Sequence, residues 1–204
     1  SGAGGDTASA IAAGCPAVVK AHPGHPGLSV RCGQVVGAAL VGAGAPAGAL
    51  AVVHGIAAGR SLVQHPAVKA VGFTGSLAGG RALLDLANAR PDPIPFYGEL
   101  GSLNPAVITP GALANRSADI VKGFVASFTL GTGQFCTKPG LLFLPRGHGL
   151  DDALAGAVRA AAVGPLLDER ILARYRDTAT RLAAAPGVRE LVPRAEVLGT
   201  GYRA

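Results

Sequence analysis

Short apolar runs alternate with longer helix-like segments along most of this 204-residue chain. The short runs are rich in valine and bounded by Gly, Pro or polar residues, which is typical of buried strands, whereas the lengths of the other segments favour helices. The predicted strands are 17–20, 49–54, 68–73, one that begins near 96, and 106–109. The predicted helices are 7–13, 29–42, 59–65, 77–89, 117–130 and 169–184. This alternation predicts an α/β fold with a parallel sheet and a ligand crevice at the carboxyl edge of its strands.

The turn after the strand 68–73 has the layout of a phosphate-binding site. It reads Thr74-Gly75-Ser76, and the next predicted helix begins directly after it. Gly75 lets the backbone approach a ligand closely, and the first turn of the helix directs N–H groups at an anion bound beside Ser76. A Gly-Ser turn alone is a weak signal, and the strand–helix alternation strengthens it.

Lys20 ends the strand 17–20, at the edge where open α/β sheets bind ligands. A contact with a ribose or phosphate and a plain solvated strand end are both consistent with this position. The following loop holds His22 and His25, but two histidines without a third ligand are weak support for a metal site. We therefore predict no metal.

Composition indicates a globular protein, because 49% of the residues are hydrophobic and 15% are charged. The three cysteines have neither zinc-site spacing nor the density of a disulfide framework, which favours a reducing, cytoplasmic compartment. The net charge is +6, but the 18 Lys and Arg residues are scattered and aromatic residues are few, so we predict no nucleic-acid partner.

Methionine is absent even at position 1, so we expect this chain to be an internal piece of a longer protein.

The segment 32–53 contains no charged residue, which raises the question of a membrane span. Gly42, Gly44, Pro46 and Gly48 interrupt this segment, and its Ala and Gly residues are only weakly apolar. A soluble helix, a turn and a strand therefore fit better, and we predict no membrane association.

The stretch 131–140, Gly-Thr-Gly-Gln-Phe-Cys-Thr-Lys-Pro-Gly, places Cys136 among glycines and polar residues. Small neighbours let a substrate approach the sulfur, and Lys138 favours the thiolate, so Cys136 is a candidate nucleophile. A small, buried, unreactive cysteine is the alternative. Cys15 and Cys32 have mostly small or apolar neighbours, and we predict that both are packing residues.

Glu99 is the single carboxylate of the stretch 96–105. In uncharged surroundings it would be partly desolvated, and partial desolvation makes a carboxylate a better general base. A carboxylate whose hydrogen bonds are satisfied within a turn is the alternative.

Four segments taken together resemble the aldehyde dehydrogenase superfamily. They are Val19-Lys20, Val-Gly-Phe-Thr-Gly-Ser at 71–76, Glu-Leu-Gly at 99–101 and Gly-Gln-Phe-Cys at 133–136. Their order and spacing match that family over nearly the whole chain. The amino-acid sequences of segments 97–105 and 133–140 most resemble those of its α-ketoglutaric semialdehyde (2,5-dioxovalerate) dehydrogenase branch.

The resemblance implies that Cys136 forms a thiohemiacetal with an aldehyde and then a thioester. It implies that Glu99 activates the water that releases the acid. Most members carry a second glycine where this chain has Ser102, a change that fits the named branch and that we expect to leave the chemistry unaltered.

The resemblance also implies a nicotinamide coenzyme. Ser76 and the helix after it would hold the pyrophosphate, Lys20 would contact the adenosine ribose, and we assign Gly75 and Leu100 to the same site. In many NAD-preferring members a glutamate three positions after the lysine binds the ribose hydroxyls, and this chain has Pro23 there. A 2′-phosphate is then not repelled, so we predict NADP, with NAD as the alternative.

The expected fold is therefore α/β and aldehyde-dehydrogenase-like, with part of a Rossmann-type coenzyme domain at 1–98 and part of an α/β catalytic domain at 99–204. We expect the full-length protein to be a homo-oligomer that oxidises a small aldehyde to its acid. The family's oxyanion asparagine and a glutamate in a Phe-Gly-Pro context are absent from this chain, so we expect residues 1–204 alone to be inactive. The alternative is a non-catalytic remnant that acts only in folding or subunit interaction.

Overall fold

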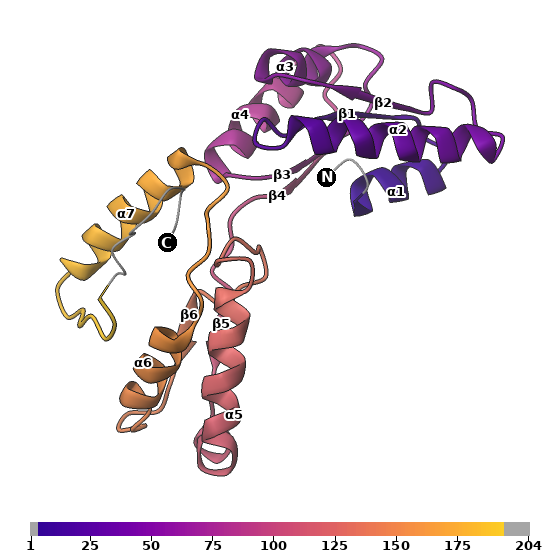
Figure 1. Ribbon diagram of the computed structural model, residues 1–204. Coiled ribbons are helices and arrows are strands. Elements are labelled where there is room, and N and C mark those ends of the chain that lie inside the picture. Colours follow the sequence, from indigo (N-terminus) through magenta and orange to yellow (C-terminus); the bar gives the residue numbers. More distant parts are fainter. Residues whose placement is uncertain (1–3, 194–204) are drawn as a thin grey trace. The chain divides into compact units, whose positions relative to one another are not determined.

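The computed structural model describes residues 4–193, so residues 194–204 of the predicted catalytic part lie outside it. The chain divides into two compact units, Ser1–Gly101 and Ser102–Ala204. Figure 1 traces the elements of both units in sequence colours.

The first unit alternates helices and strands, as the sequence predicts. Its helices are α1 (Gly5–Ala12), α2 (Pro26–Gly42), α3 (Ile56–Gln64) and α4 (Leu77–Asn88), and its strands are β1 (Ala17–Lys20), β2 (Leu50–Val53), β3 (Val71–Thr74) and β4 (Phe96–Glu99). β1 pairs in parallel with β2, and β3 pairs in parallel with β4. Because α2 and α4 connect the paired strands, each pair forms a β-α-β unit (Figure 1).

The core of this unit lies where α3 and α4 meet the start of β3. Val63 of α3 and Ala87 of α4 are 4% and 0% exposed, and Ile94, which precedes β4, is 9% exposed. Partly buried apolar residues pack around these three side chains, namely Val68, Val71, Leu83 and Leu86. This cluster fixes α4 against its strands, and so fixes the turn that leads into α4.

Two glycines let the helices lie close to the strands. A Cβ at Gly33 of α2 would stand 2.5 Å from Cγ2 of Val52, and a Cβ at Gly80 of α4 would stand 2.0 Å from Cδ2 of Leu100. Real carbon atoms do not approach so closely, so a side chain at Gly33 or Gly80 would require Val52 or Leu100 to move.

The second unit is a smaller β-α-β arrangement with two further helices. Its elements are β5 (Pro105–Val107), α5 (Pro110–Thr129), β6 (Leu141–Phe143), α6 (Asp151–Ala160) and α7 (Glu169–Ala183). β5 pairs in parallel with β6. Ala106 and Leu142 lie on the α5 side of this pair, whereas Val107, Leu141 and Phe143 are exposed. The described residues therefore cover one face of β5–β6, although parallel sheets are normally covered on both faces.

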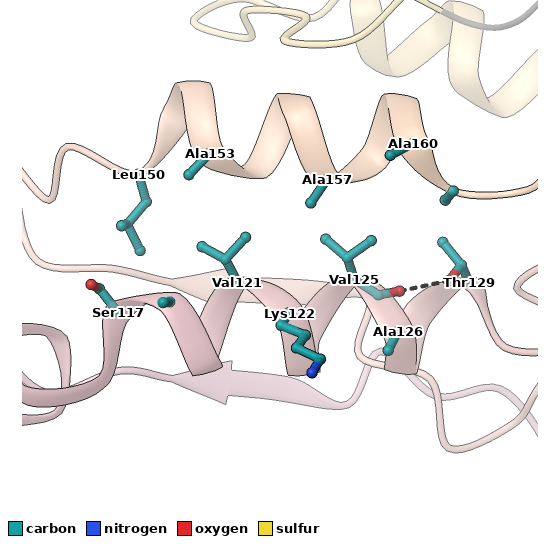
Figure 2. Close-up of a pocket in the computed structure, with 12 residues that line it drawn as sticks. Ser117, Val121, Lys122, Val125, Ala126, Thr129, Leu150, Ala153, Ala157 and Ala160 are labelled. Carbon is teal, nitrogen blue, oxygen red and sulfur yellow. Dashed lines mark hydrogen bonds between the residues drawn. The ribbon is translucent and has the colours of Figure 1, made fainter.

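α5 and α6 pack through small side chains. Figure 2 shows Val121 and Val125 of α5 and Ala153 and Ala157 of α6 pointing toward one another. A shallow groove of about 680 Å³ follows this seam, and none of the residues predicted for catalysis or coenzyme binding lines it.

Several element predictions need correction. α5 begins at Pro110 rather than at residue 117, because Thr109 caps it by accepting a hydrogen bond from the amide of Ala112 at 3.3 Å. Arg116 breaks the helical geometry at φ −149° and ψ 37°, so the predicted start marks this kink. Two elements are not among the predictions, the three-residue strand β6 and the ten-residue helix α6.

Cys15 is exposed, so the prediction that it is a packing residue is wrong. It lies in the turn after α1, which Gly14 ends at a φ of 76°. Cys32, within α2, is partly buried.

The uncharged segment 32–53 forms the end of α2, a turn and β2, which confirms the predicted order of elements. No helix built from residues 4–193 has both the length and the apolarity needed to cross a membrane.

Candidate active site

Cys136 lies in the exposed loop between α5 and β6, as predicted. The loop begins with a sharp turn in which Gly131, Thr132 and Gly133 have φ values of 59°, 57° and 70°. Left-handed backbone is unusual for a residue such as Thr132. This conformation reverses the chain after α5 and leads it into the cysteine segment.

Two side chains from the segment before β5 hold the carbonyl oxygen of Cys136. Ser102 Oγ donates to it at 2.8 Å, and Asn104 Nδ2 donates to it at 2.7 Å. Asn104 Nδ2 also donates to the carbonyl oxygen of Lys138 at 2.9 Å. The amide of Gly140 donates to the carbonyl oxygen of Leu103 at 2.7 Å. The main chain after the cysteine is therefore tied at three points to residues 102–104.

Gln134 ties the other side of the loop to the segment before α7. Its Oε1 accepts from the amide of Leu167 at 2.9 Å. Its Nε2 donates to the carbonyl oxygens of Gly131 at 3.1 Å and Pro165 at 3.4 Å. Close packing supports this connection, since a Cβ at Gly164 would stand 2.3 Å from Oγ1 of Thr132.

The thiol of Cys136 makes no hydrogen bond among the described residues of its unit, while the main chain around it is held on both sides. A fixed backbone with an exposed, unbonded sulfur suits a nucleophile. The role of Lys138 in favouring the thiolate stays a prediction.

Glu99 lies at the carboxyl end of β4, opposite Thr74 of β3. Its carbonyl oxygen accepts from the amide of Gly75 at 3.0 Å. The residue is exposed, so the predicted partial desolvation of its carboxylate is wrong within the described residues. The reason is its place at the strand end, where β4 is exposed from Tyr97 onward.

Gly75 and Ser76 form the turn between β3 and α4. Ser76 caps α4, because its Oγ accepts from the amide of Gly79 at 3.2 Å and its carbonyl oxygen accepts from the amide of Gly80 at 2.9 Å. The amides of Leu77 and Ala78 lie in the first turn of α4, where backbone N–H groups have no acceptor within the helix, and this turn holds no acidic residue. The turn therefore fits the pyrophosphate of a dinucleotide.

The other two predicted coenzyme residues pack against helices of the same unit. The stem of Lys20 lies over α3, where a Cβ at Gly59 would stand 3.2 Å from its Cγ and Cδ. The side chain of Leu100 lies against Gly80 of α4. Gly75, Glu99 and Leu100 thus share one edge of the β3–β4 pair, while Lys20 ends β1 of the other pair.

The loop-holding roles of Ser102, Asn104 and Gln134 are not among the sequence predictions. One available signal was the Asn-Pro pair at 104–105, since asparagine tolerates left-handed backbone and Asn104 has a φ of 43°. The partners lie more than 30 positions away, which no local pattern reveals.

No group of three or more His, Cys, Asp or Glu side chains within residues 4–193 is placed to hold a metal ion. His22 and His25 stack with ring centres 5.1 Å apart, and each ring has a local partner, since Gly24 N donates to His22 Nδ1 and Ser29 Oγ bonds to His25 Nδ1.

The family model described as the aldehyde dehydrogenase family matches residues 3–172. The chain belongs to the aldehyde dehydrogenase family. This confirms the resemblance inferred from the four short segments.

Two relatives point to one branch of the family. Alpha-ketoglutaric semialdehyde dehydrogenase 2 of Azospirillum brasilense is 52% identical over 194 residues, which cover 93% of this chain and 37% of that protein. Alpha-ketoglutaric semialdehyde dehydrogenase of Acinetobacter baylyi is 43% identical over 177 residues, which cover 85% of this chain and 34% of that protein. The chain thus spans only a little over a third of the length of these relatives.

A solved structure supports the fold. The crystal structure of an aldehyde dehydrogenase from Bartonella henselae superposes with a TM-score of 0.75 at 18% identity, and the match covers 97% of this chain and 42% of that one. At this identity the likeness concerns the fold alone. It confirms the predicted α/β, aldehyde-dehydrogenase-like class, of which this chain forms a part.

Proposed function

We propose that the full-length protein oxidises α-ketoglutaric semialdehyde to the carboxylic acid, with NADP as coenzyme and Cys136 as nucleophile. The observation that carries this proposal is the exposed, unbonded thiol of Cys136 on a loop whose main chain is held from both sides. The names of the two relatives support the substrate.

In the proposed reaction the thiolate of Cys136 attacks the aldehyde carbon and forms the oxyanion of a thiohemiacetal. Loss of hydride from that carbon leaves a thioester on the sulfur. Glu99 takes a proton from water, the water oxygen adds to the thioester carbon, and the carbon–sulfur bond breaks to return the thiolate. The acid therefore gains its second oxygen from water.

The bound nicotinamide would supply the two-electron acceptor for that hydride. The turn at Gly75 and Ser76 would hold the pyrophosphate, because the first amides of α4 are free of acidic neighbours. Lys20 would contact the adenosine ribose and Leu100 would contribute to the same site. Pro23 supports NADP over NAD, because no carboxylate stands there to repel a 2′-phosphate.

The proposal extends to the cellular compartment and the oligomeric state of the full-length protein. The cysteine pattern supports a reducing, cytoplasmic compartment, and the resemblance supports a homo-oligomer. A panel of semialdehydes, tested on the full-length protein, would identify the preferred substrate.

The test is the substitution Cys136→Ser in the full-length protein. A serine hydroxyl is far less nucleophilic than a thiol, so we expect no NADPH burst and no steady-state turnover. Cys15→Ser is the matched control, since Cys15 is also exposed, and it should retain the wild-type rate. Undiminished turnover in Cys136→Ser, or no turnover of any semialdehyde by the wild-type protein, would contradict the proposal.

A further inference from the structure

Ser102 and Asn104 together satisfy the carbonyl oxygen of Cys136. A carbonyl oxygen has two lone pairs, and here two donors approach it, Ser102 Oγ at 2.8 Å and Asn104 Nδ2 at 2.7 Å. Among the described residues of this unit, 102–193, no other carbonyl oxygen of the loop 131–140 accepts hydrogen bonds from two different side chains. The doubly bonded carbonyl belongs to the residue that carries the thiol.

The donors of Asn104 are fully used in this arrangement. Its side-chain amide has two N–H groups, and its two shortest contacts are to the carbonyl oxygens of Cys136 and Lys138, at 2.7 and 2.9 Å. Asn104 Nδ2 also lies 3.0 Å from Ser102 Oγ, so the two side chains that bond to Cys136 contact each other. The hydroxyl proton of Ser102 is directed to Cys136, so the three groups form one connected network.

The backbone of Asn104 is adapted to this task. Its φ of 43° lies in the left-handed region, which asparagine, aspartate and glycine tolerate better than other residues. Pro105, the first residue of β5, follows directly, so the donor is attached to a strand. The adjoining bond from Gly140 N to Leu103 O, at 2.7 Å, holds the loop at a second point.

We infer that Asn104 and Ser102 are positioning residues. They fix the main chain of Cys136 and thereby the position from which its side chain presents the sulfur. This inference rests on the proposed function only in taking Cys136 as the nucleophile. It also gives a role to Ser102, which stands where most members of the family have a glycine. A displacement of about 1 Å in a reacting group costs on the order of 10²-fold in rate, so the network should matter to acylation.

The substitutions are chosen to separate hydrogen bonding from shape and backbone. Asn104→Gly keeps the left-handed backbone accessible and removes the donor, whereas Asn104→Asp keeps the size and replaces the donor by an acceptor. Ser102→Ala removes the hydroxyl, and Ser102→Thr keeps it. Asn115→Asp is the matched control, because Asn115 is exposed on α5 and makes no bond to the loop.

Two readouts are made on the full-length protein. The first is amide hydrogen–deuterium exchange of peptides covering 131–140, which needs no activity and reports local opening. The second is the single-turnover NADPH burst with α-ketoglutaric semialdehyde, measured beside NADP affinity and thermal stability.

We expect exchange at 131–140 to quicken in both Asn104 variants and in Ser102→Ala. The burst should slow by about 10²-fold in the Asn104 variants and by about tenfold in Ser102→Ala, with NADP affinity unchanged. Ser102→Thr should recover most of the rate, and Asn115→Asp should match the wild type.

Unchanged exchange and an unchanged burst in Asn104→Gly and Ser102→Ala would overturn the inference. A wild-type burst in Asn104→Asp would also overturn it, because shape rather than donation would then suffice. If the Asn104 variants do not fold, Ser102→Ala against Ser102→Thr decides the question. If the wild-type protein gives no burst, the proposed function fails, and the exchange data still decide whether the network holds the loop.

Discussion

The turn before α4 and the loop before β6 are both polar, glycine-containing and exposed, yet they are held in different ways. At the turn, Ser76 bonds to residues three and four positions ahead, and Gly75 bonds to the adjacent strand. At the loop, the hydrogen bonds to other segments reach residues 31 to 37 positions away. The turn is therefore held by bonds within itself and by one bond to β4, whereas the cysteine loop is held by several bonds to segments that precede β5 and α7.

This difference suits the two proposed tasks. A pyrophosphate needs amides and a helix end, which a local turn supplies wherever a helix begins. A nucleophile needs a sulfur fixed relative to other groups, which only contacts from elsewhere in the fold provide. Distant substitutions should therefore disturb the loop and leave the turn intact.

The largest effect is expected from Gln134→Ala. This change removes the bonds to Pro165 and Leu167 and leaves the Leu167 amide without its partner, so the acylation burst should slow by about 10²-fold. Stopped-flow measurement of NADPH in the full-length protein checks this. Gln34→Ala, an exposed position on α2, is the control, and equal rates in the two variants would show that the tie is dispensable.

Gly140→Ala should displace the backbone at the carboxyl-terminal end of the cysteine loop and destabilise the protein. The new Cβ would stand 2.8 Å from the carbonyl oxygen of Leu103, so the backbone must shift, at a cost of about 1–3 kcal/mol in the free energy of unfolding. Denaturant unfolding measures the change. Gly111→Ala is the control, since nothing lies within 4 Å of a Cβ there, and a Gly140→Ala protein as stable as that control would contradict the close approach.

Pro23→Glu should alter coenzyme choice and leave the loop unaffected. A carboxylate three positions after Lys20 would repel a 2′-phosphate and bind ribose hydroxyls, so the ratio of kcat/KM for NADP to that for NAD should fall by about tenfold. Steady-state kinetics with both coenzymes check this shift. A wild-type protein that already prefers NAD would contradict the premise.

Ser76→Ala should have the smallest effect, confined to the turn. Loss of the cap bond to Gly79 should lower the free energy of unfolding by about 1 kcal/mol and weaken coenzyme binding. Calorimetric titration with NADP and thermal unfolding measure both quantities, with Ser61→Ala on α3 as the control. Faster exchange at 131–140 in Ser76→Ala would show that the turn and the loop are not independent.

The same contrast explains how much could be predicted from the sequence. The turn was predicted in place, with Ser76 at the start of its helix, because capping follows from neighbouring residues. Cys136 was singled out because its glycine-rich surroundings are visible locally. The roles of Ser102 and Asn104 were not, since they depend on β5 and β6 pairing in parallel, and β6 is too short to be recognised. The exposure of Glu99 was also missed, because sequence does not show which strand ends are covered.

The most direct test of the account locates the acyl group. In full-length Glu99→Gln, deacylation should be slow, so mixing with α-ketoglutaric semialdehyde and NADP should leave a covalent acyl adduct visible by intact-mass spectrometry. Peptide mapping should place the adduct on Cys136. An adduct on Cys15 or Cys32 would show that the loop held by Ser102, Asn104 and Gln134 does not present the nucleophile.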